Sequence, residues 1–325
     1  MKILFIGSSK YDYLQDILFS GLYKILGSEN LKTVNFHKNY FLPLKDYPKN
    51  LGFNKKSILT FQPFGLNLQE FSAVVVGSSK PDTFRTFKKL LPKIPPHCKI
   101  IYVDGGDEPE IGGDLKRLNV AHLYPNKTER PFDHIFKREY LLNKDYNQNV
   151  HPLPFGFNFD RLNKNERLNF KYDVSFWAVE SDPIRSKALK MIENEFDCSK
   201  NGTKLTQNFS DYNRKGNFYL EELNRCKITL NFRGGGWDTL RYWEVPAMGR
   251  FMISQKPGIL IPNDFKEGQH IIHPKKDLSD LVEICNYYLE NENEREKIAK
   301  SAEEHTKKYH SDIVRAQYLI DIITK

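Results

Sequence analysis

Short apolar runs alternate with amphipathic stretches along the first half of the chain. Two of the apolar runs, residues 2–6 and 73–76, have the length of a strand and lead into the same Gly-Ser-Ser triplet. Residues 13–26 instead place apolar side chains three or four positions apart, the spacing of a helix with one buried face. Strands that alternate with helices are typical of parallel sheets, so this half predicts an α/β domain.

Further elements continue the alternation. A helix is expected at residues 83–91, because prolines at positions 92, 95 and 96 follow it. Strands are expected at residues 99–103, 120–123 and 134–137. Prolines at 152 and 154 and a glycine at 156 then break the pattern, which indicates the end of the first domain.

The alternation restarts after this break. The expected strands are residues 172–178, 227–232 and 250–254, and the expected helices are residues 183–196, 219–226, 239–248, 278–289 and 292–309. The pattern predicts two Rossmann-like α/β domains, residues 1–155 and 156–310, that face a cleft. Within the last segment, 311–325, residues 312–323 form an amphipathic helix for which the pattern indicates no docking surface.

The composition is that of a folded protein. A length of 325 residues corresponds to about two domains. Aromatic residues make up 13% of the chain, which excludes disorder as a description of the whole. The net charge of +8 is modest, and no run of five basic residues occurs, so no nucleic-acid partner is expected. An anionic ligand or a peripheral contact with an anionic membrane remains open.

The cysteines and the apolar runs favour a cytoplasmic location. Cys98, Cys198, Cys226 and Cys285 have no metal-ligand spacing, which predicts buried thiols in a reducing compartment. The first apolar run is too short for a signal peptide. No later run reaches the roughly 18 apolar residues of a membrane span.

The most informative segment begins with three consecutive glycines after the expected strand at 227–232. Gly234, Gly235 and Gly236 allow the backbone to approach a ligand closely. Asp238 or Thr239 can cap the helix that follows, and the N-terminal amides of such a helix favour an anion.

Arg241 and Glu244 are three residues apart and therefore share one face of that helix. An arginine suits a diphosphate and a carboxylate suits the two hydroxyls of a ribose, so the pair fits a sugar nucleotide. The alternative is a capped core helix with an Arg–Glu pair on its surface. The chain contains no GxGxxG motif, which weakens the case for NAD(P).

This segment resembles the donor-binding region of GT-B fold glycosyltransferases, especially the CgeB-like (spore maturation protein-like) group and the glycosyl transferases group 1 family. The resemblance covers residues 219–310 and rests on Arg-x-x-Glu at 241–244, followed by a small residue, a glycine and a strand. It implies that Glu244 binds the donor ribose, and that Arg241 and the three glycines lie near the diphosphate. Many retaining members carry an earlier glutamate, which Trp237 or Gly236 replaces here, so the contacts to the donor sugar cannot be carried over.

Two further arginines are candidate phosphate ligands. Arg185 follows a predicted strand and turn, and Pro183 suits the first turn of its helix. Such a turn lies beyond the carboxyl end of its strand and faces the cleft. Arg233, directly before the glycines, is expected to face the diphosphate as well. For Arg185 the alternative is a solvated arginine on a helix surface.

An acidic turn after the strand at 99–103 offers candidates for a catalytic base. Asp104, Asp107 and Glu108 lie at the end of a buried strand, where one carboxylate could accept the proton of an acceptor hydroxyl. The alternative is a turn whose Asp, Gly and Pro residues serve its backbone geometry alone. Lys137 and Arg138 could add two cations to the cleft, or begin a solvated helix. No metal site is expected.

The sequence thus predicts a metal-independent glycosyltransferase of polysaccharide or glycoconjugate biosynthesis. It would move a sugar from a nucleotide-diphosphate-sugar to a hydroxyl of a carbohydrate or glycoconjugate acceptor, with no tightly bound cofactor. A non-catalytic nucleotide- or sugar-binding protein on the same fold and an NAD(P)-dependent oxidoreductase are the alternatives. The sequence leaves the nucleotide, the sugar, the stereochemistry and the oligomeric state open.

Overall fold

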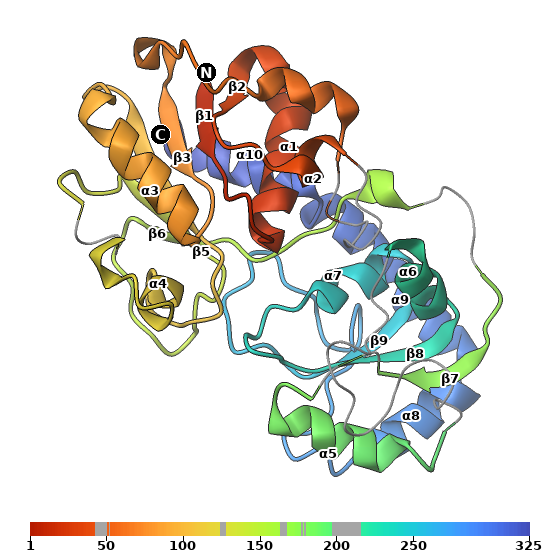
Figure 1. The fold of residues 1–325 in the computed structure, drawn as a ribbon. Coiled ribbons are helices and arrows are strands. Elements are labelled where there is room, and N and C mark those ends of the chain that lie inside the picture. The colour runs from red at the N-terminus through yellow and green to blue at the C-terminus, as the bar shows by residue number, and fades with distance from the viewer. Residues whose placement is uncertain are drawn as a thin grey trace.

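The computed structural model describes residues 1–42, 51, 53–123, 128–162, 168–176, 178, 180–196 and 216–325. They form two α/β domains with separate parallel sheets (Figure 1). Cys98, Cys226 and Cys285 are free and buried as expected, whereas Cys198 lies outside the described residues. Within the described part of the chain, no helix is long and apolar enough to cross a membrane.

The first domain is built on a six-stranded sheet with the order β2-β1-β3-β4-β5-β6, in which every neighbouring pair is parallel. The strands are β1 (Ile3–Ile6), β2 (Leu31–Thr33), β3 (Ala73–Val76), β4 (Lys99–Asp104), β5 (His134–Lys137) and β6 (Val150–Pro152). The helices are α1 (Tyr13–Asn30), α2 (Lys38–Phe41), α3 (Pro81–Leu90) and α4 (Gly113–Arg117). All residues of β1 and β3 are buried, as expected of strands covered on both faces.

The second domain holds a three-stranded parallel sheet with the order β7-β8-β9. Its strands are β7 (Tyr172–Ser175), β8 (Cys226–Asn231) and β9 (Phe251–Ser254). Its helices are α5 (Pro183–Ile192), α6 (Gly216–Asn224), α7 (Leu240–Ala247), α8 (Leu281–Glu290) and α9 (Glu292–Tyr309). The predicted α/β class with two parallel sheets is confirmed, and the boundary at residues 155 and 156 stays a prediction.

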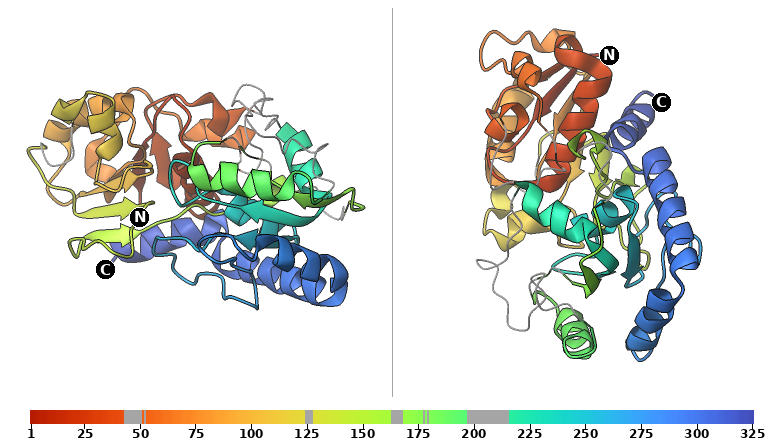
Figure 2. Two further views of the ribbon diagram at one scale, coloured as in Figure 1. Left: turned by 90° about the horizontal axis from the view of Figure 1, so that it is seen from below. Right: turned by 90° about the vertical axis from the view of Figure 1, so that its right-hand side faces the viewer.

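The last helix, α10 (Asp312–Ile323), returns to the first domain and packs against α1. Figure 2 shows α9 and α10 following one another along one side of the molecule. The Asp312 carboxylate accepts from the Ser20 hydroxyl at 2.8 Å and pairs with the Lys24 ammonium at 2.8 Å. The helices touch at Gly21, where a Cβ would overlap the Asp312 carbonyl. The chain thus closes on its own N-terminal domain, which is the docking surface that the sequence pattern did not indicate.

One predicted strand is wrong and two strands were not expected. Residues 120–123 do not form a strand, because Asn119 adopts a left-handed conformation with φ of 57° and the chain turns into a 3-10 helix, Ala121–Leu123. The missed strands, β2 and β6, are three residues long and lie at the two edges of the first sheet. Each contains polar or proline positions, so neither shows the apolar run by which a buried strand is recognised.

The close approach of α1 and α10 predicts that Gly21→Ala is destabilising. The added methyl group has no room, and such overpacking costs about 1–3 kcal/mol of the free energy of unfolding. Glu29→Ala, at an exposed position of the same helix, is the control and should leave stability nearly unchanged. Urea unfolding measures both variants, and equal stability of Gly21→Ala and the wild type would contradict the close packing.

Candidate functional site

The carboxyl ends of the two sheets meet at the junction between the domains, and the three glycines lie at the centre of this contact. Each glycine faces a side chain from another segment. A Cβ on Gly234 would lie 2.9 Å from the Arg185 guanidinium, and one on Gly235 would lie 2.8 Å from the Asp107 carboxylate. A Cβ on Gly236 would overlap the Glu139 carboxylate. Gly235 and Gly236 therefore allow close packing of the two domains, and Gly234 allows close packing within the second domain, in addition to any approach of a ligand.

Glu139, which follows β5 in the first domain, binds the backbone of the second. Its side chain is buried, with the residue 1% exposed. Its carboxylate accepts from the amide of Trp237 at 2.9 Å and from the amide of Asp238 at 3.0 Å. These two amides precede α7, in the region where backbone amides were expected to favour an anion. In the described structure, a carboxylate of the protein itself occupies them.

Arg138 lies next to Glu139 and extends the same contact. Its guanidinium donates to the Asp238 carbonyl at 3.0 Å and is ion-paired with Asp107. It also lies over the ring of Phe155, 4.6 Å from the ring centre, in a cation–π contact. Of the two cations that were expected to reach the cleft, Arg138 thus lies at the junction. Its position in the fold excludes the solvated-helix interpretation.

Asp238 is the buried carboxylate of the glycine turn. It accepts from the Phe155 amide at 2.6 Å and from the Trp243 indole at 2.8 Å. Burial raises the pKa of Asp238 to about 7, although the positive charge of Arg138 opposes this shift. Of the two predicted caps of the next helix, Thr239 is confirmed as the N-cap residue by position, but neither side chain makes the cap hydrogen bond. Thr239 stands at the N-cap position of α7, but its hydroxyl donates to Asn231 at 2.7 Å.

Arg185 and Arg233 both lie beside the glycine turn, at the carboxyl end of β8. The Arg185 guanidinium donates to the carbonyls of Arg233 at 2.7 Å and Phe232 at 3.0 Å, and its residue is buried rather than solvated. The Arg233 guanidinium pairs with Asp182 at 3.2 Å and lies over the Trp237 ring at 4.5 Å from its centre. With 31% of its side chain exposed, Arg233 can still reach a ligand.

Arg241 and Glu244 are both buried in α7, so the interpretation as a surface pair is wrong. Arg241 is 3% exposed and its guanidinium lies 5.2 Å from the ring centre of Phe176. Glu244 is fully buried, and its carboxylate accepts from the Tyr219 hydroxyl at 3.0 Å. The whole of α7 is enclosed, and each of its residues is buried.

The structure separates the three carboxylates of the acidic turn. Asp104 is buried and ion-paired with Lys137 at 3.2 Å, and it also accepts from the Ser79 hydroxyl at 2.8 Å. Lys137 therefore belongs to the core and not to the cleft. Glu108 points toward Arg117, whose Nε lies at 3.5 Å. Asp107 alone of the three abuts the glycine turn, with 54% of its side chain exposed.

Two acidic residues near the site, Glu139 and Asp12, were not among the predicted site residues. Asp12 caps α1 by accepting from the Gln15 amide at 3.2 Å, and it accepts from the Ser78 hydroxyl at 2.5 Å. A Cβ on Gly105 would lie 3.1 Å from Asp12, so this carboxylate adjoins the acidic turn. Burial raises the pKa of Asp12. The available signals were an N-cap aspartate shortly after the first Gly-Ser-Ser triplet and a glutamate shortly after a strand.

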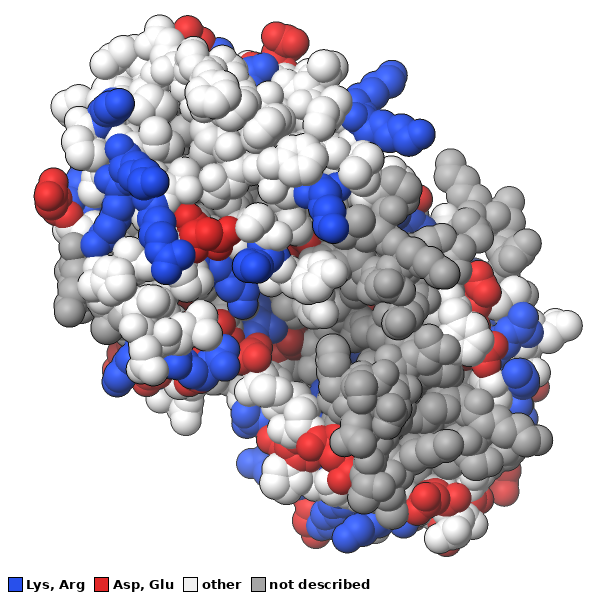
Figure 3. Space-filling view, in the orientation of Figure 1, with Lys and Arg blue, Asp and Glu red and all other residues white. Residues whose placement is uncertain are grey.

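Charged side chains of both signs gather on the left of the region between the two lobes in Figure 3. The arginines described above are partnered by carboxylates or backbone carbonyls, as at Arg138, Arg185 and Arg233. Among the residues that the structure describes, no group of three or more His, Cys, Asp and Glu side chains is placed to hold a metal ion.

The raised pKa of Asp238 predicts a pH-dependent stability. The folded state binds this proton more tightly than the unfolded state, so the stabilisation is complete below about pH 4 and is lost as the pH rises through about 7. Relative to Asp238→Asn, the wild type should lose up to about 1.4 kcal/mol of unfolding free energy per pH unit in this range. Urea unfolding from pH 4 to 8 measures the difference.

The exposed Asp321 provides the matched control for this experiment. Asp321→Asn should keep the pH profile of the wild type, because its carboxylate lies outside the junction. Parallel pH profiles of the wild type and Asp238→Asn would contradict the proton uptake by Asp238.

Residues 188–321 match the family model described as "Glycosyl transferase-like". No curated protein sequence matches the chain. Among solved structures, the chain is similar to Anabaena HepE in complex with UDP, with a TM-score of 0.63, 11% identity and 100% of both chains covered. It is also similar to an alpha-glucosyltransferase in complex with UDP and DNA, with a TM-score of 0.62, 12% identity and 100% of both chains covered.

A third similar structure is sucrose-phosphate synthase from Thermosynechococcus elongatus, with a TM-score of 0.57, 10% identity, and 100% of this chain and 98% of that chain covered. At such identities the likeness concerns the fold, and it extends over the whole chain. The predicted GT-B fold is thereby confirmed, and the second half of the chain carries the glycosyl transferase-like segment.

Proposed function

We propose that the chain is a glycosyltransferase that moves a sugar from a UDP-sugar to a hydroxyl of a carbohydrate or glycoconjugate acceptor. The observation that carries the proposal is the position of Arg185 and Arg233 beside the glycine turn. Arg233 lies within the glycosyl transferase-like segment, and Arg185 lies shortly before it. Open α/β sheets bind ligands beyond the carboxyl ends of their strands, and this is where both arginines lie.

The second domain would hold the donor. Arg233, which is partly exposed, would bind the diphosphate, and Arg185 would fix the backbone of Arg233 through its hydrogen bond to the Arg233 carbonyl. Positive charge there stabilises the UDP that leaves when the sugar is transferred. Because two of the similar structures are complexes with UDP, UDP is the nucleotide that we propose. In this proposal Arg241 supports the site. Glu244 is buried and bonded to Tyr219, so a ribose hydroxyl would donate to it only after Tyr219 moves aside.

The first domain would hold the acceptor and the base. Asp107 is our candidate base, because it is exposed and lies against Gly235 at the junction. Its carboxylate could accept the proton of an acceptor hydroxyl, and the ion pair with Arg138 would hold it in position. Asp104 and Glu108 would shape the turn instead, since Asp104 is ion-paired in the core and Glu108 faces Arg117. We also infer that arginines supply the positive charge at the diphosphate, so that the transfer needs no divalent cation. We further propose that the protein acts in the cytoplasm.

Arg233→Ala tests the donor site. We expect UDP to raise the Tm of the wild type, as a ligand does that binds only the folded state. Loss of one charged hydrogen-bonding partner costs about 1.5–3 kcal/mol, so Arg233→Ala should weaken UDP binding by roughly 10- to 100-fold. Thermal shifts and titration calorimetry with UDP measure this, with NAD as the comparison ligand.

Arg225→Ala is the matched control, because Arg225 is also a partly exposed arginine of the second domain and pairs with Glu222 at 3.5 Å. It should bind UDP as the wild type does. Stabilisation by NAD and not by UDP would contradict the proposal. Release of UDP from UDP-sugars in the presence of EDTA, reduced in Asp107→Asn, would separate a metal-independent enzyme from a non-catalytic binder.

A further inference from the structure

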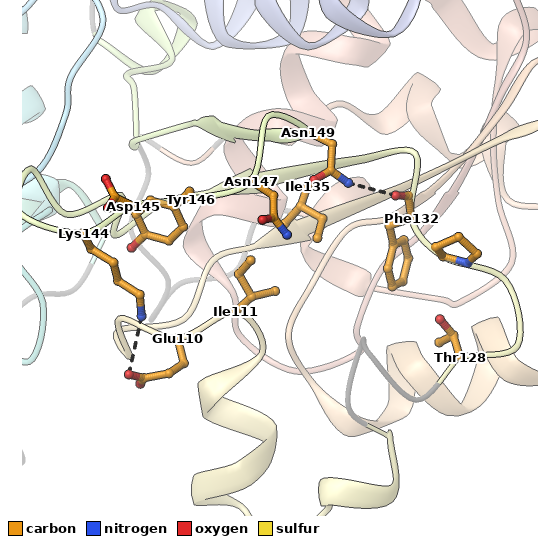
Figure 4. A pocket seen from close by; sticks show the side chains of 11 residues that line it. Glu110, Ile111, Thr128, Phe132, Ile135, Lys144, Asp145, Tyr146, Asn147 and Asn149 are labelled. Atoms are coloured by element: carbon orange, nitrogen blue, oxygen red, sulfur yellow. Dashed lines mark hydrogen bonds and ion pairs between the residues drawn. The ribbon is translucent and has the colours of Figure 1, made fainter.

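A pocket of about 560 Å³ lies in the first domain, beside β5 and outside the glycine turn. Figure 4 shows it between the end of the acidic turn, at Glu110 and Ile111, and residues 144–149, which precede β6. Its volume falls within the range of pockets that hold small molecules, about 300–1,000 Å³.

The two ends of this pocket differ in polarity. At one end, Lys144 and Glu110 approach one another at 3.5 Å, and the exposed Asp145 lines the same end with its carboxylate directed away from that pair (Figure 4). The other end is formed by the apolar side chains of Phe132 and Ile135, and Ile111 lies between the two ends (Figure 4). A ligand that fits both ends therefore has a polar part rich in hydrogen-bonding groups and an apolar part.

The polar end of the pocket is connected to the domain junction through Tyr146. The ring of this tyrosine lines the pocket, and its hydroxyl lies 3.2 Å from the Pro109 carbonyl and 3.3 Å from the Glu139 carbonyl. Pro109 follows the candidate base by two residues, and Glu139 binds the amides of the glycine turn. The wall of the pocket is thus attached to two of the segments that the first domain contributes to the junction.

A second connection passes through the backbone. The Leu142 amide donates to the Gly258 carbonyl at 3.1 Å, and the Leu260 amide donates to the Tyr140 carbonyl at 2.8 Å. Gly258 in turn packs against the indole of Trp237, to which a Cβ would approach within 2.9 Å. The segment that leads into the pocket is therefore hydrogen-bonded to the second domain next to the glycine turn.

We infer that this pocket binds the acceptor, and that the acceptor is an amphiphilic glycoside with an apolar aglycone. Its sugar would lie at the end formed by Lys144, Glu110 and Asp145, where charged groups and a tyrosine ring suit carbohydrate hydroxyls and C–H faces. The aglycone would lie on Phe132 and Ile135. This inference deepens the proposed function and rests on it, because it supplies the acceptor class for the same transfer.

Asn147→Trp tests the pocket directly. Asn147 is exposed and points into the pocket between its two ends (Figure 4), so an indole there fills the pocket with little effect on the core. Gln148→Trp is the matched control, because Gln148 is the next residue, is equally exposed and does not line the pocket. The probes are the 4-nitrophenyl glycosides of glucose, galactose, mannose and N-acetylglucosamine, each compared with its free sugar by saturation-transfer NMR and calorimetry.

We expect at least one 4-nitrophenyl glycoside to bind the wild type and Gln148→Trp more tightly than its free sugar does. Its affinity for Asn147→Trp should fall by about tenfold or more, because the pocket is filled. Equal affinity for both tryptophan variants, equal binding of free sugar and glycoside, or no binding by any probe would overturn the inference. The thermal shift caused by UDP is measured on the same three proteins to keep the two proposals separate. Absence of this shift in all three contradicts the donor proposal, independently of glycoside binding.

Discussion

The contact between Glu139 and the amides of Trp237 and Asp238 is the interaction on which the arrangement of the domain junction depends. It joins a side chain of the first domain to the backbone of the second at 2.9 and 3.0 Å. A buried carboxylate that accepts two amide hydrogen bonds beside an arginine is well satisfied, whereas removal of one partner leaves a charge uncompensated. The glycine turn can receive this carboxylate only because Gly236 has no side chain. Asp107, Arg138 and Arg233 lie beside the same turn.

Much of the fold could be predicted from the sequence, because the buried elements carry strong patterns. The runs at β1 and β3 and the helices α1, α9 and α10 are long or regular enough to be recognised. The prediction was wrong at 120–123, where the left-handed Asn119 turns the chain into a 3-10 helix. The edge strands β2 and β6 were missed because three residues at a sheet edge need no apolar run. The docking of α10 on α1 depends on a tertiary contact at Gly21, to which no local pattern points.

The candidate site was predictable in its parts but not in its connections. The sequence indicated the glycine turn and the basic residues around it, and the structure brings Arg185 and Arg233 to that turn. It could not indicate that the Glu139 carboxylate binds the amides of the glycine turn, because the run Lys137-Arg138-Glu139 has the composition of a solvated surface. Only the contact between distant segments shows that Lys137 belongs to the core and Arg138 and Glu139 to the junction. The same contacts divide the acidic turn into a core residue, Asp104, and a junction residue, Asp107.

If the chain is a glycosyltransferase, a nucleoside diphosphate binds at the junction, beside the glycine turn. Hydrogen–deuterium exchange with and without saturating UDP locates the ligand without assuming a reaction. We predict slower exchange in peptides that cover residues 181–186 and 232–241, and unchanged exchange in α3 and β6. Protection confined to the first domain, or protection in neither of these two segments, would contradict this prediction.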